Sequence, residues 1–308
     1  MIVHLGVKSD PIVARYSFDW LFDLMKGHGV HRLQLGSSFP FWFAADDWFH
    51  ALRRSAEARS IRISSSFSSF RELGFANSDR LLDEAVLHGW ERAIHVAALV
   101  GAESFGSNAC LVLRDRPLTR EPGLRTFTEN MKSLLATARS AGLKALTIEP
   151  MSSLYEVPST PDEIRTIAEE LAAYHACHAS TTVPLHLCGD ISHGVADFQG
   201  RVIHDNWSLF EMQIPWMREF HFKNTDAIFN STFGFDPAER GKGIVDLPRL
   251  RSLIDANAAR FPSGEITGYL EIPGPKLGRD YTDPHLERML VESIQALKAV
   301  FTEGESTS

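Results

Sequence analysis

The sequence has few cysteines and no long apolar run. Its three cysteines, Cys110, Cys177 and Cys188, form no CxxC pair, which indicates reduced thiols rather than a disulfide framework. Apolar runs such as "AIHVAALV" are far shorter than the roughly 18 residues that span a bilayer. The opening residues "MIVHLGVKSD" lack the basic and apolar pattern of a secretory leader. We therefore expect a cytoplasmic protein without a membrane partner.

Dense runs of lysine and arginine are also missing. The chain carries 31 basic and 39 acidic residues, which gives a net charge of -8. A protein that wraps nucleic acid needs basic side chains to neutralise phosphates, so we expect no nucleic-acid partner. No Gly-x-Gly-x-x-Gly follows the first predicted strand, which argues against an open dinucleotide-binding sheet. The expected ligand is a small molecule.

What the sequence does contain is one unit repeated eight times. Short apolar segments rich in β-branched residues alternate with longer amphipathic segments, which is typical of parallel βα units. The predicted strands are 2–9, 31–38, 61–69, 103–111, 143–150, 183–190, 218–225 and 268–275. The predicted helices are 16–28, 44–58, 78–100, 124–141, 161–177, 207–217, 247–260 and 283–301. We predict an α/β fold, a single (β/α)8 TIM barrel over residues 1–302, followed by a polar, frayed tail at 303–308.

Four residues of metal-ligand type fall on the last four predicted strands. Glu149 ends the fifth strand in "LTIEP" and Asp190 ends the sixth in "LHLCGD". His221 lies in the seventh strand, and Glu271 lies near the end of the eighth. The carboxyl ends of barrel strands meet at the mouth where barrel enzymes carry their chemistry. Three carboxylates gathered there would repel one another unless they were protonated or neutralised, so we predict a divalent metal site.

The ligand types indicate which metal this site would hold. Two glutamates, one aspartate and one imidazole suit octahedral Mn2+, Mg2+ or Co2+ better than a tetrahedral Zn2+ site, and Mn2+ is the preferred prediction. His186 and Cys188 share the alternation of Asp190 on the sixth strand, so a thiolate-bearing zinc site is an alternative. Inward packing of the barrel is the favoured role for both. Taken singly, each carboxylate or histidine is more often a cap or a packed residue, so the metal hypothesis rests on the four together.

The arrangement resembles the xylose-isomerase-like barrel superfamily, and within it the ketose 3-epimerase branch of the D-tagatose and D-psicose 3-epimerases. That branch holds its metal with a Glu, an Asp, a His and a Glu on strands five to eight, so the resemblance implies that Glu149, Asp190, His221 and Glu271 are the ligands. The branch also has a substrate-binding His three residues after the Asp, and "GDISH" supplies His193.

Two departures from the branch concern substrate binding. The second Glu of the family stands six residues after the first, whereas "EPMSSLYE" places Glu156 seven residues on and lacks the family's Asn-Arg pair. A substrate-binding Arg usually follows the strand-seven His, but Ala227 stands there. The resemblance therefore implies that Glu156 contacts a substrate different from a free hexulose.

The segments "LGVKSDPIVARYSFDWLFDL" and "EPMSS" resemble a narrower subgroup of tetritol catabolism, which epimerises a tetrulose 1-phosphate such as erythrulose 1-phosphate. Basic side chains suited to a phosphate are available. Lys223 shares the alternation of His221, Arg240 lies with Lys242 in "ERGKG", and Lys8 ends the first strand. We expect these residues to bind a ketose phosphate.

The resemblance implies a metal-dependent isomerase that inverts C3 of a ketose through a cis-enediolate. Glu149 and Glu271 would be the acid and base, in an order that the sequence leaves open. An aldose-ketose isomerase and a keto-inositol dehydratase are alternatives on the same metal site, and a non-enzymatic sugar-binding barrel is a third. An endonuclease-IV-type enzyme is disfavoured because "SSSFSSF" and "FGSNAC" contain no His and "HFKNTDAIF" has no DxH. Family members often dimerise, so the resemblance is compatible with a homodimer or a tetramer. The aromatic segment "SSFPFWFAADDWF" is expected to form either a lid or a subunit contact.

Overall fold

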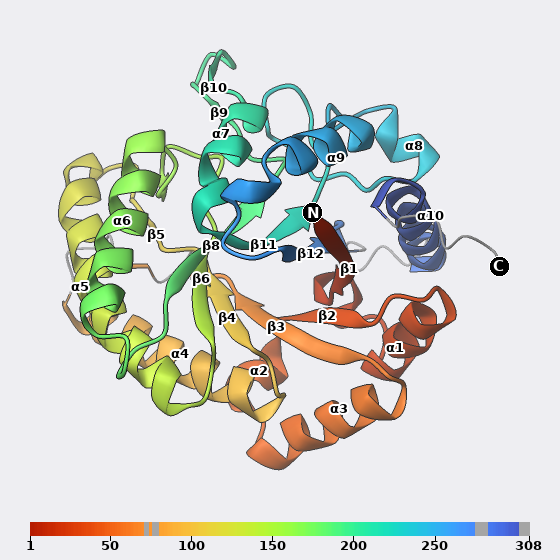
Figure 1. The fold of residues 1–308 in the computed structure, drawn as a ribbon, viewed down its shortest axis with the longest axis horizontal. Coiled ribbons are helices and arrows are strands. Elements are labelled where there is room, and N and C mark those ends of the chain that lie inside the picture. Colours follow the sequence, from red (N-terminus) through yellow and green to blue (C-terminus); the bar gives the residue numbers. More distant parts are fainter. Residues whose placement is uncertain (71–73, 76–79, 275–282, 302–308) are drawn as a thin grey trace.

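Eight parallel strands form a closed barrel (Figure 1). The computed structural model describes residues 1–70, 74–75, 80–274 and 283–301, and the predicted tail at 303–308 lies outside them. The barrel strands are β1 (Ile2–Lys8), β2 (Arg32–Gly36), β3 (Arg62–Ser68), β4 (Ser104–Ser107), β6 (Ala145–Ile148), β8 (Leu185–Asp190), β11 (Met217–Phe222) and β12 (Glu265–Leu270). Each pairs with the next around the ring, and β1 pairs with β12 to close it. The predicted (β/α)8 TIM barrel is confirmed.

Helices surround the strands on the outside of the ring (Figure 1). They are α1 (Phe18–Gly27), α2 (Phe39–Phe43), α3 (Asp46–Ala58), α4 (Arg80–Leu99), α5 (Arg120–Ser140), α6 (Pro161–Cys177), α7 (Asn206–Gln213), α8 (Pro237–Arg240), α9 (Leu247–Ala256) and α10 (Asp283–Phe301). The start of α6 is fixed by a capping box, in which the Thr160 side chain accepts from the Glu163 backbone and the Glu163 side chain accepts in return from the Thr160 backbone. Among the described residues, no helix is both long and apolar enough to cross a membrane.

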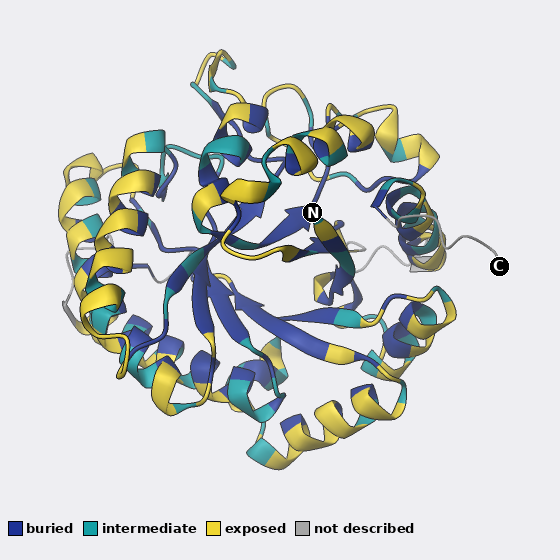
Figure 2. Cartoon of the chain, in the orientation of Figure 1, coloured by how far each residue is buried: buried dark blue, intermediate teal, exposed yellow. Residues whose placement is uncertain are grey.

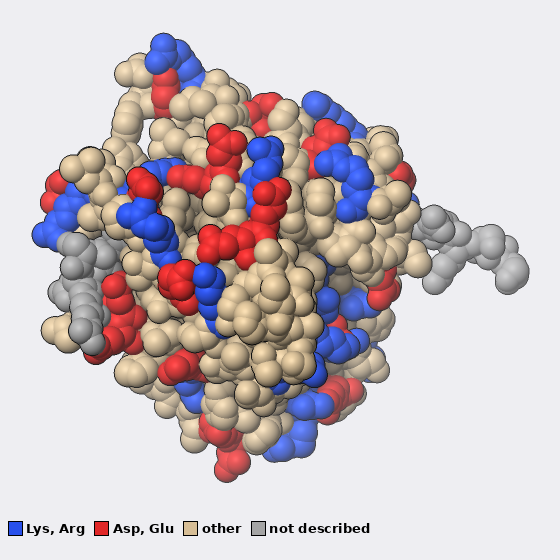
Figure 3. Space-filling model, turned by 60° about the vertical axis from the view of Figure 1, so that its left-hand side comes forward, with Lys and Arg blue, Asp and Glu red and all other residues tan. Residues whose placement is uncertain are grey.

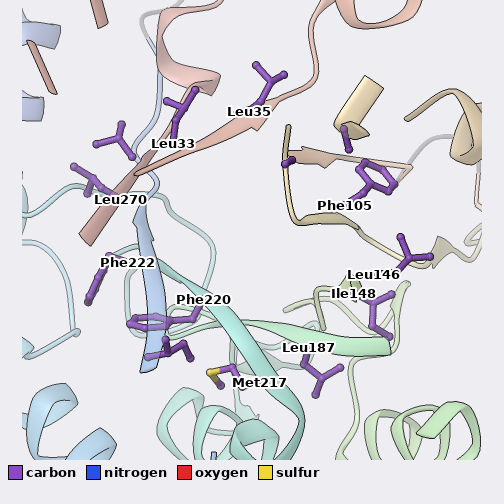
Figure 4. Packing of buried hydrophobic residues seen from close by; sticks show 14 of the residues in the cluster. Leu33, Leu35, Phe105, Leu146, Ile148, Leu187, Met217, Phe220, Phe222 and Leu270 are labelled. Carbon is purple, nitrogen blue, oxygen red and sulfur yellow. The ribbon is translucent and has the colours of Figure 1, made fainter. Parts of the chain in front are cut away.

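The main core lies between the strands and the helices. Phe220 and Phe222 of β11 point away from the barrel axis, as do Leu33, Leu187 and other apolar strand residues in Figure 4. Figure 2 shows the strands buried and the helices exposed on their outer sides. Burying each such side chain contributes about 1.5–3 kcal/mol. Because side chains alternate along a strand, the residues between these apolar ones face the barrel interior.

Each strand differs from its predicted bounds by a few residues, and the two with the largest differences are explained by pairing. The eighth strand was predicted at 268–275, but β12 runs earlier because its Glu265–Leu270 pair with Ile2–Val7 of β1. Pro273 has no backbone N–H with which to extend this pairing. The fourth strand was predicted at 103–111, but β4 ends at Ser107. The chain then forms β5 (Cys110–Leu111), which pairs antiparallel with β7 (Glu156–Val157).

The surface carries charges of both signs. On the face drawn in Figure 3, Lys and Arg side chains are interspersed with Asp and Glu side chains. Two short segments rise from the ring as a hairpin, β9 (Val195–Ala196) and β10 (Val202–His204), at the top of Figure 1. Phe39 and Phe43 of α2 are exposed, and the lid or subunit contact expected for this segment stays a prediction.

Candidate metal centre

The carboxyl ends of four neighbouring strands bring the predicted ligands into one cluster. Asp190 ends β8 and is the register partner of His221 near the end of β11. Glu149 and Glu271 directly follow β6 and β12. One ligand atom of each residue lies within 4.8 Å of the others. Glu149, Asp190 and His221 are buried and Glu271 is partly buried, so the four form a metal-type cluster at the barrel mouth.

The His221 ring stands among the three carboxylates. Its Nδ1 lies 2.9 Å from Glu149 Oε1 and 3.1 Å from Glu271 Oε2. Asp190 Oδ2 is further away, at 3.9 Å from the same nitrogen. Nδ1 is therefore the ring nitrogen directed at the centre of the cluster.

Two lysines lie directly against the carboxylates. Lys8 Nζ is 2.8 Å from Glu271 Oε2 and also pairs with Asp10 at 3.2 Å. Lys223 Nζ is 2.7 Å from Asp190 Oδ2 and 3.3 Å from Glu271 Oε1. Both lysines are buried, and Lys223 faces the mouth as its alternation with His221 predicts. The ammonium groups partly neutralise a set of charges that burial would otherwise make unfavourable.

The two glutamates are ionised at neutral pH in this environment. Burial acts to raise the pKa of Glu149, but the neighbouring His221, His193 and Lys223 together outweigh it and hold that pKa well below its usual range. Burial acts in the same way on Glu271, where Lys223 and Lys8 together hold the pKa well below its usual range. Both side chains can therefore serve as anionic ligands or as proton acceptors.

The residues present fit a hard divalent cation. Three carboxylates and one imidazole are a mostly oxygen donor set. Within the described ranges, the buried Asp190 Oδ2 accepts no well-oriented hydrogen bond, although Lys223 Nζ lies 2.7 Å away. A cation would bind this oxygen and would offset the repulsion among the carboxylates.

The thiolate alternative has less support in the structure. Cys188 Sγ lies 3.5 Å from Nε2 of His221, the nitrogen on the far side of the ring from Glu149. Burial raises the pKa of the Cys188 thiol well above its usual range, so it stays protonated. His186 lines a cavity of about 200 Å³ that also includes Tyr269 and Glu219, away from the cluster. Both residues pack inside or beneath the barrel, as the favoured interpretation expects.

Two cavities open at the mouth. The inner one, of about 210 Å³, is lined by Glu149 and Glu271 together with Lys8, Asp10, Phe67 and Asn108, among others. The outer one, of about 550 Å³, is lined by Arg114, Tyr155, Glu156, His193 and Phe198, among others. Met151 and Lys223 line both. Lys223 therefore stands where the metal cluster meets the larger cavity.

The remaining predicted substrate residues separate into two groups. His193 donates from Nδ1 to the Pro150 carbonyl at 2.8 Å, and its Nε2 lies 3.2 Å from Lys223 Nζ. Glu156 lines the outer cavity. Arg240, in contrast, is exposed at the end of α8 and lines neither of these two cavities. The structure brings His193 and Glu156 to the mouth and leaves Arg240 outside it.

Three residues that the sequence did not single out also contact the site. The amide oxygen of Gln34, in β2, lies 2.8 Å from His221 Nε2. The Asn108 side-chain amide donates to Glu149 Oε2 at 3.0 Å. Arg114 lies over the Tyr155 ring, 5.3 Å from its centroid, in the outer cavity. A polar residue inside the apolar strand "RLQLG" was the available signal for Gln34.

Comparisons with known proteins agree with this architecture. The model of the family described as "Xylose isomerase-like TIM barrel" matches residues 22–298. A Rhodospirillum rubrum protein provisionally assigned as a xylose isomerase shares 22% identity, with a TM-score of 0.77 over 97% of this chain and 99% of that one. A D-psicose 3-epimerase solved in the presence of D-fructose shares 13% identity, with a TM-score of 0.68 over 97% and 99%.

An L-ribulose 3-epimerase shares 10% identity, with a TM-score of 0.70 over 97% of this chain and 95% of that one. No curated protein matches the chain in sequence. At these identities the solved structures establish the fold alone, whereas the family model covers most of the chain. The protein belongs to the xylose isomerase-like TIM barrel family.

Proposed function

We propose that this protein is a divalent-metal-dependent epimerase that inverts C3 of a small ketose. The observation that carries the proposal is the cluster of Glu149, Asp190, His221 and Glu271, whose ligand atoms lie within 4.8 Å of one another at the barrel mouth. Two structural neighbours are named as D-psicose and L-ribulose 3-epimerases, which favours C3 of a ketose as the reacting centre.

The four clustered residues would hold the cation, for which Mn2+ is preferred over Mg2+ or Co2+. Such a cation, when bound, polarises a ketose carbonyl and makes the neighbouring C–H more acidic. Asn108 orients the Glu149 carboxylate by donating to its Oε2, and Lys8 holds Glu271 by an ion pair of 2.8 Å. Asn108 thus holds the Glu149 oxygen that faces away from His221, whereas Lys8 binds the same Glu271 oxygen that faces His221 Nδ1.

The positions of the two glutamates support a proton transfer with inversion. In the ring, β6 and β12 are separated by β8 and β11, so Glu149 and Glu271 enter the inner cavity from separate strands on either side of His221. One carboxylate would remove the C3 proton to give an enediolate. The other, protonated in the substrate complex, would donate to the opposite face of C3. Solvent exchange would then restore the starting protonation.

We propose a tetrulose 1-phosphate, such as erythrulose 1-phosphate, as the substrate. Lys223 at the junction of the cavities and Arg114 in the outer cavity would bind the phosphate by charge-assisted hydrogen bonds. Lys8 lines the inner cavity but not the outer one, so it is better placed for a substrate oxygen near the metal. His193 and Glu156 would bind further substrate oxygens.

Hydrogen exchange tests the reaction directly. The protein is incubated with Mn2+ and a tetrulose 1-phosphate in D2O, and the products are analysed by NMR. We expect NMR to show deuterium at C3 and optical rotation to show racemisation, because C3 is the only stereocentre of a tetrulose 1-phosphate. On a ketose with a free C1 hydroxyl, deuterium restricted to C1 and C2 with an aldose product would show an aldose-ketose isomerase instead. Loss of water from a keto-inositol would show a dehydratase, and no reaction across a ketose panel would reject the proposal.

The two glutamates can be tested individually. Glu149→Gln and Glu271→Gln should each slow C3 exchange by roughly 10²–10⁴-fold, because each removes an acid-base group. Circular dichroism should show an unchanged fold. Glu103→Gln is the matched control, because Glu103 is a carboxylate that lies outside both mouth cavities. This variant should catalyse C3 exchange at the rate of the unmodified protein. A glutamate variant that keeps its exchange rate is not part of the acid-base pair.

A further inference from the structure

The barrel interior beneath the metal cluster is polar. TIM-barrel interiors are usually filled by Val, Ile and Leu. Here Gln34, Ser65 and Glu219 occupy it, and all three are buried. Glu219 stands two residues before His221 on β11, so both side chains face inward. Such a buried polar layer is unfavourable unless its hydrogen bonds are made.

These side chains form a hydrogen-bonded chain that begins at His221. Its Nε2 lies 2.8 Å from Gln34 Oε1. Gln34 Nε2 donates to Ser65 Oγ at 3.4 Å, and Ser65 Oγ donates to Glu219 Oε1 at 3.1 Å. The same Glu219 carboxylate accepts from Thr147 at 2.9 Å and from Ser104 at 3.4 Å. Four strands besides β11 thus contribute to one network.

The network has a defined direction. Because the Ser65 hydroxyl donates to Glu219, its oxygen is left to accept from Gln34. This places the amide nitrogen of Gln34 toward Ser65 and its carbonyl oxygen toward His221. A carbonyl oxygen only accepts, so the His221 ring carries a proton on Nε2, and the neutral form of the ring therefore has its lone pair on Nδ1. Cys188 Sγ, 3.5 Å from the same Nε2, is a weaker partner.

The resulting tautomer is the one that a metal at the cluster requires. Nδ1 faces Glu149 at 2.9 Å and Glu271 at 3.1 Å, and a metal-bound nitrogen must present a lone pair. We propose that Gln34 is a positioning residue of the metal centre, which fixes the His221 ring and tautomer, and that Glu219 orients the Gln34 amide through Ser65. This inference rests on the metal site of the proposed function and is independent of the substrate.

Metal affinity measured without substrate tests this role. Titration calorimetry with Mn2+ should show binding to Gln34→Met about 10–100-fold weaker than to the unmodified protein, as is typical when a partner of a metal-bound His is lost. Gln34→Glu, which keeps an acceptor oxygen beside Nε2, should recover most of the affinity. Gln213→Met is the matched control, because Gln213 is equally buried but donates to the Leu209 carbonyl in α7. It should bind Mn2+ normally.

A spectroscopic measurement separates positioning from general destabilisation. In the Mg2+-loaded protein, ¹⁵N NMR of histidine should show His221 protonated on Nε2, with a slowly exchanging proton that exchanges faster in Gln34→Met. Equal Mn2+ affinity in Gln34→Met and Gln213→Met, or binding through Nε2, would overturn the inference. If Mn2+ binds as expected but C3 exchange is absent, the proposed function fails while the role of Gln34 stands. A protein that binds no divalent cation would refute both.

Discussion

The two ends of the barrel both gather charged residues, but they do so in different surroundings. At the mouth, Lys8 and Lys223 are buried against the carboxylates of the metal cluster. Near the amino ends of the strands, Glu103 pairs with Arg62 at 2.5 Å, with Arg218 at 3.1 Å and with Lys144. There the Arg62 and Lys144 side chains are 54% and 65% exposed. The groups are of the same chemical kind, but the cations are buried at the mouth and reach water at the amino ends.

This contrast separates a stabilising network from a candidate active site. Exposed ion pairs contribute about 0–1 kcal/mol each, because water solvates the separated charges nearly as well. A buried cluster of charges has a desolvation cost that its own pairs only partly offset. A fold has no need of such a cluster for stability, so burial of like charges at a barrel mouth favours a functional role.

The largest loss of unfolding free energy is expected when Lys223 is substituted. Lys223→Met removes a buried partner of Asp190 and Glu271, and we expect the metal-free protein to lose about 3–5 kcal/mol of unfolding free energy. Added Mn2+ should restore most of this loss, because the cation supplies the missing positive charge. Urea unfolding in chelator and in Mn2+ measures both quantities.

Lys242→Met provides the matched control for this experiment. Lys242 is exposed and pairs with Glu239 at 2.7 Å, so its loss should cost about 1 kcal/mol or less, with no dependence on Mn2+. Equal losses in the two variants would contradict the contrast between buried and exposed charges.

A smaller effect is expected from His186 at the amino end of the barrel. Burial lowers the pKa of His186 to about 4, whereas an unfolded chain has a His pKa near 6.5. Between these values the unfolded state binds a proton that the folded state does not. The contribution of neutral His186 is therefore complete above about pH 6.5 and is lost as the pH falls toward 4, by at most about 3 kcal/mol.

His186→Leu should flatten the dependence of unfolding free energy on pH in this window. Urea unfolding at pH 7, 6 and 5 gives the comparison, and the difference between variant and unmodified protein isolates His186 from the other histidines. Parallel pH profiles would show that this part of the barrel end is solvated as fully as the Glu103 pairs.

The smallest effect is expected at Glu103 itself. Glu103→Gln removes the charge from three ion pairs, yet each cation keeps access to water, so we expect a loss of about 1 kcal/mol or less. Mn2+ affinity by calorimetry should be unchanged. A loss comparable with that of Lys223→Met would mean that the two barrel ends do not differ in the way their exposure indicates.

The barrel and the residues that meet at its mouth could be predicted from local sequence patterns. The alternation of Phe220, His221 and Phe222 shows which side chains face the helices and which face the axis, because the period of two is a local property of a strand. Glu149 and Asp190 could be placed at the mouth because each follows or ends a recognisable apolar segment. Parallel strands in a barrel present their carboxyl ends together, so strand order alone made these residues neighbours.

How these residues are held depends on the closed ring. Lys8 meets Glu271 across 263 positions of sequence because closure pairs β1 with β12, and Gln34 meets His221 across 187 because the side chains of β2 and β11 both point into the barrel interior. The same closure moved the bounds of β12, since β1 selects the residues with which it pairs. Arg240 lies outside the mouth, because the path of the chain after β11 depends on tertiary packing that a local sequence pattern does not predict. Side-chain type and strand position are local in the sequence, whereas contacts between distant strands exist only once the ring is closed.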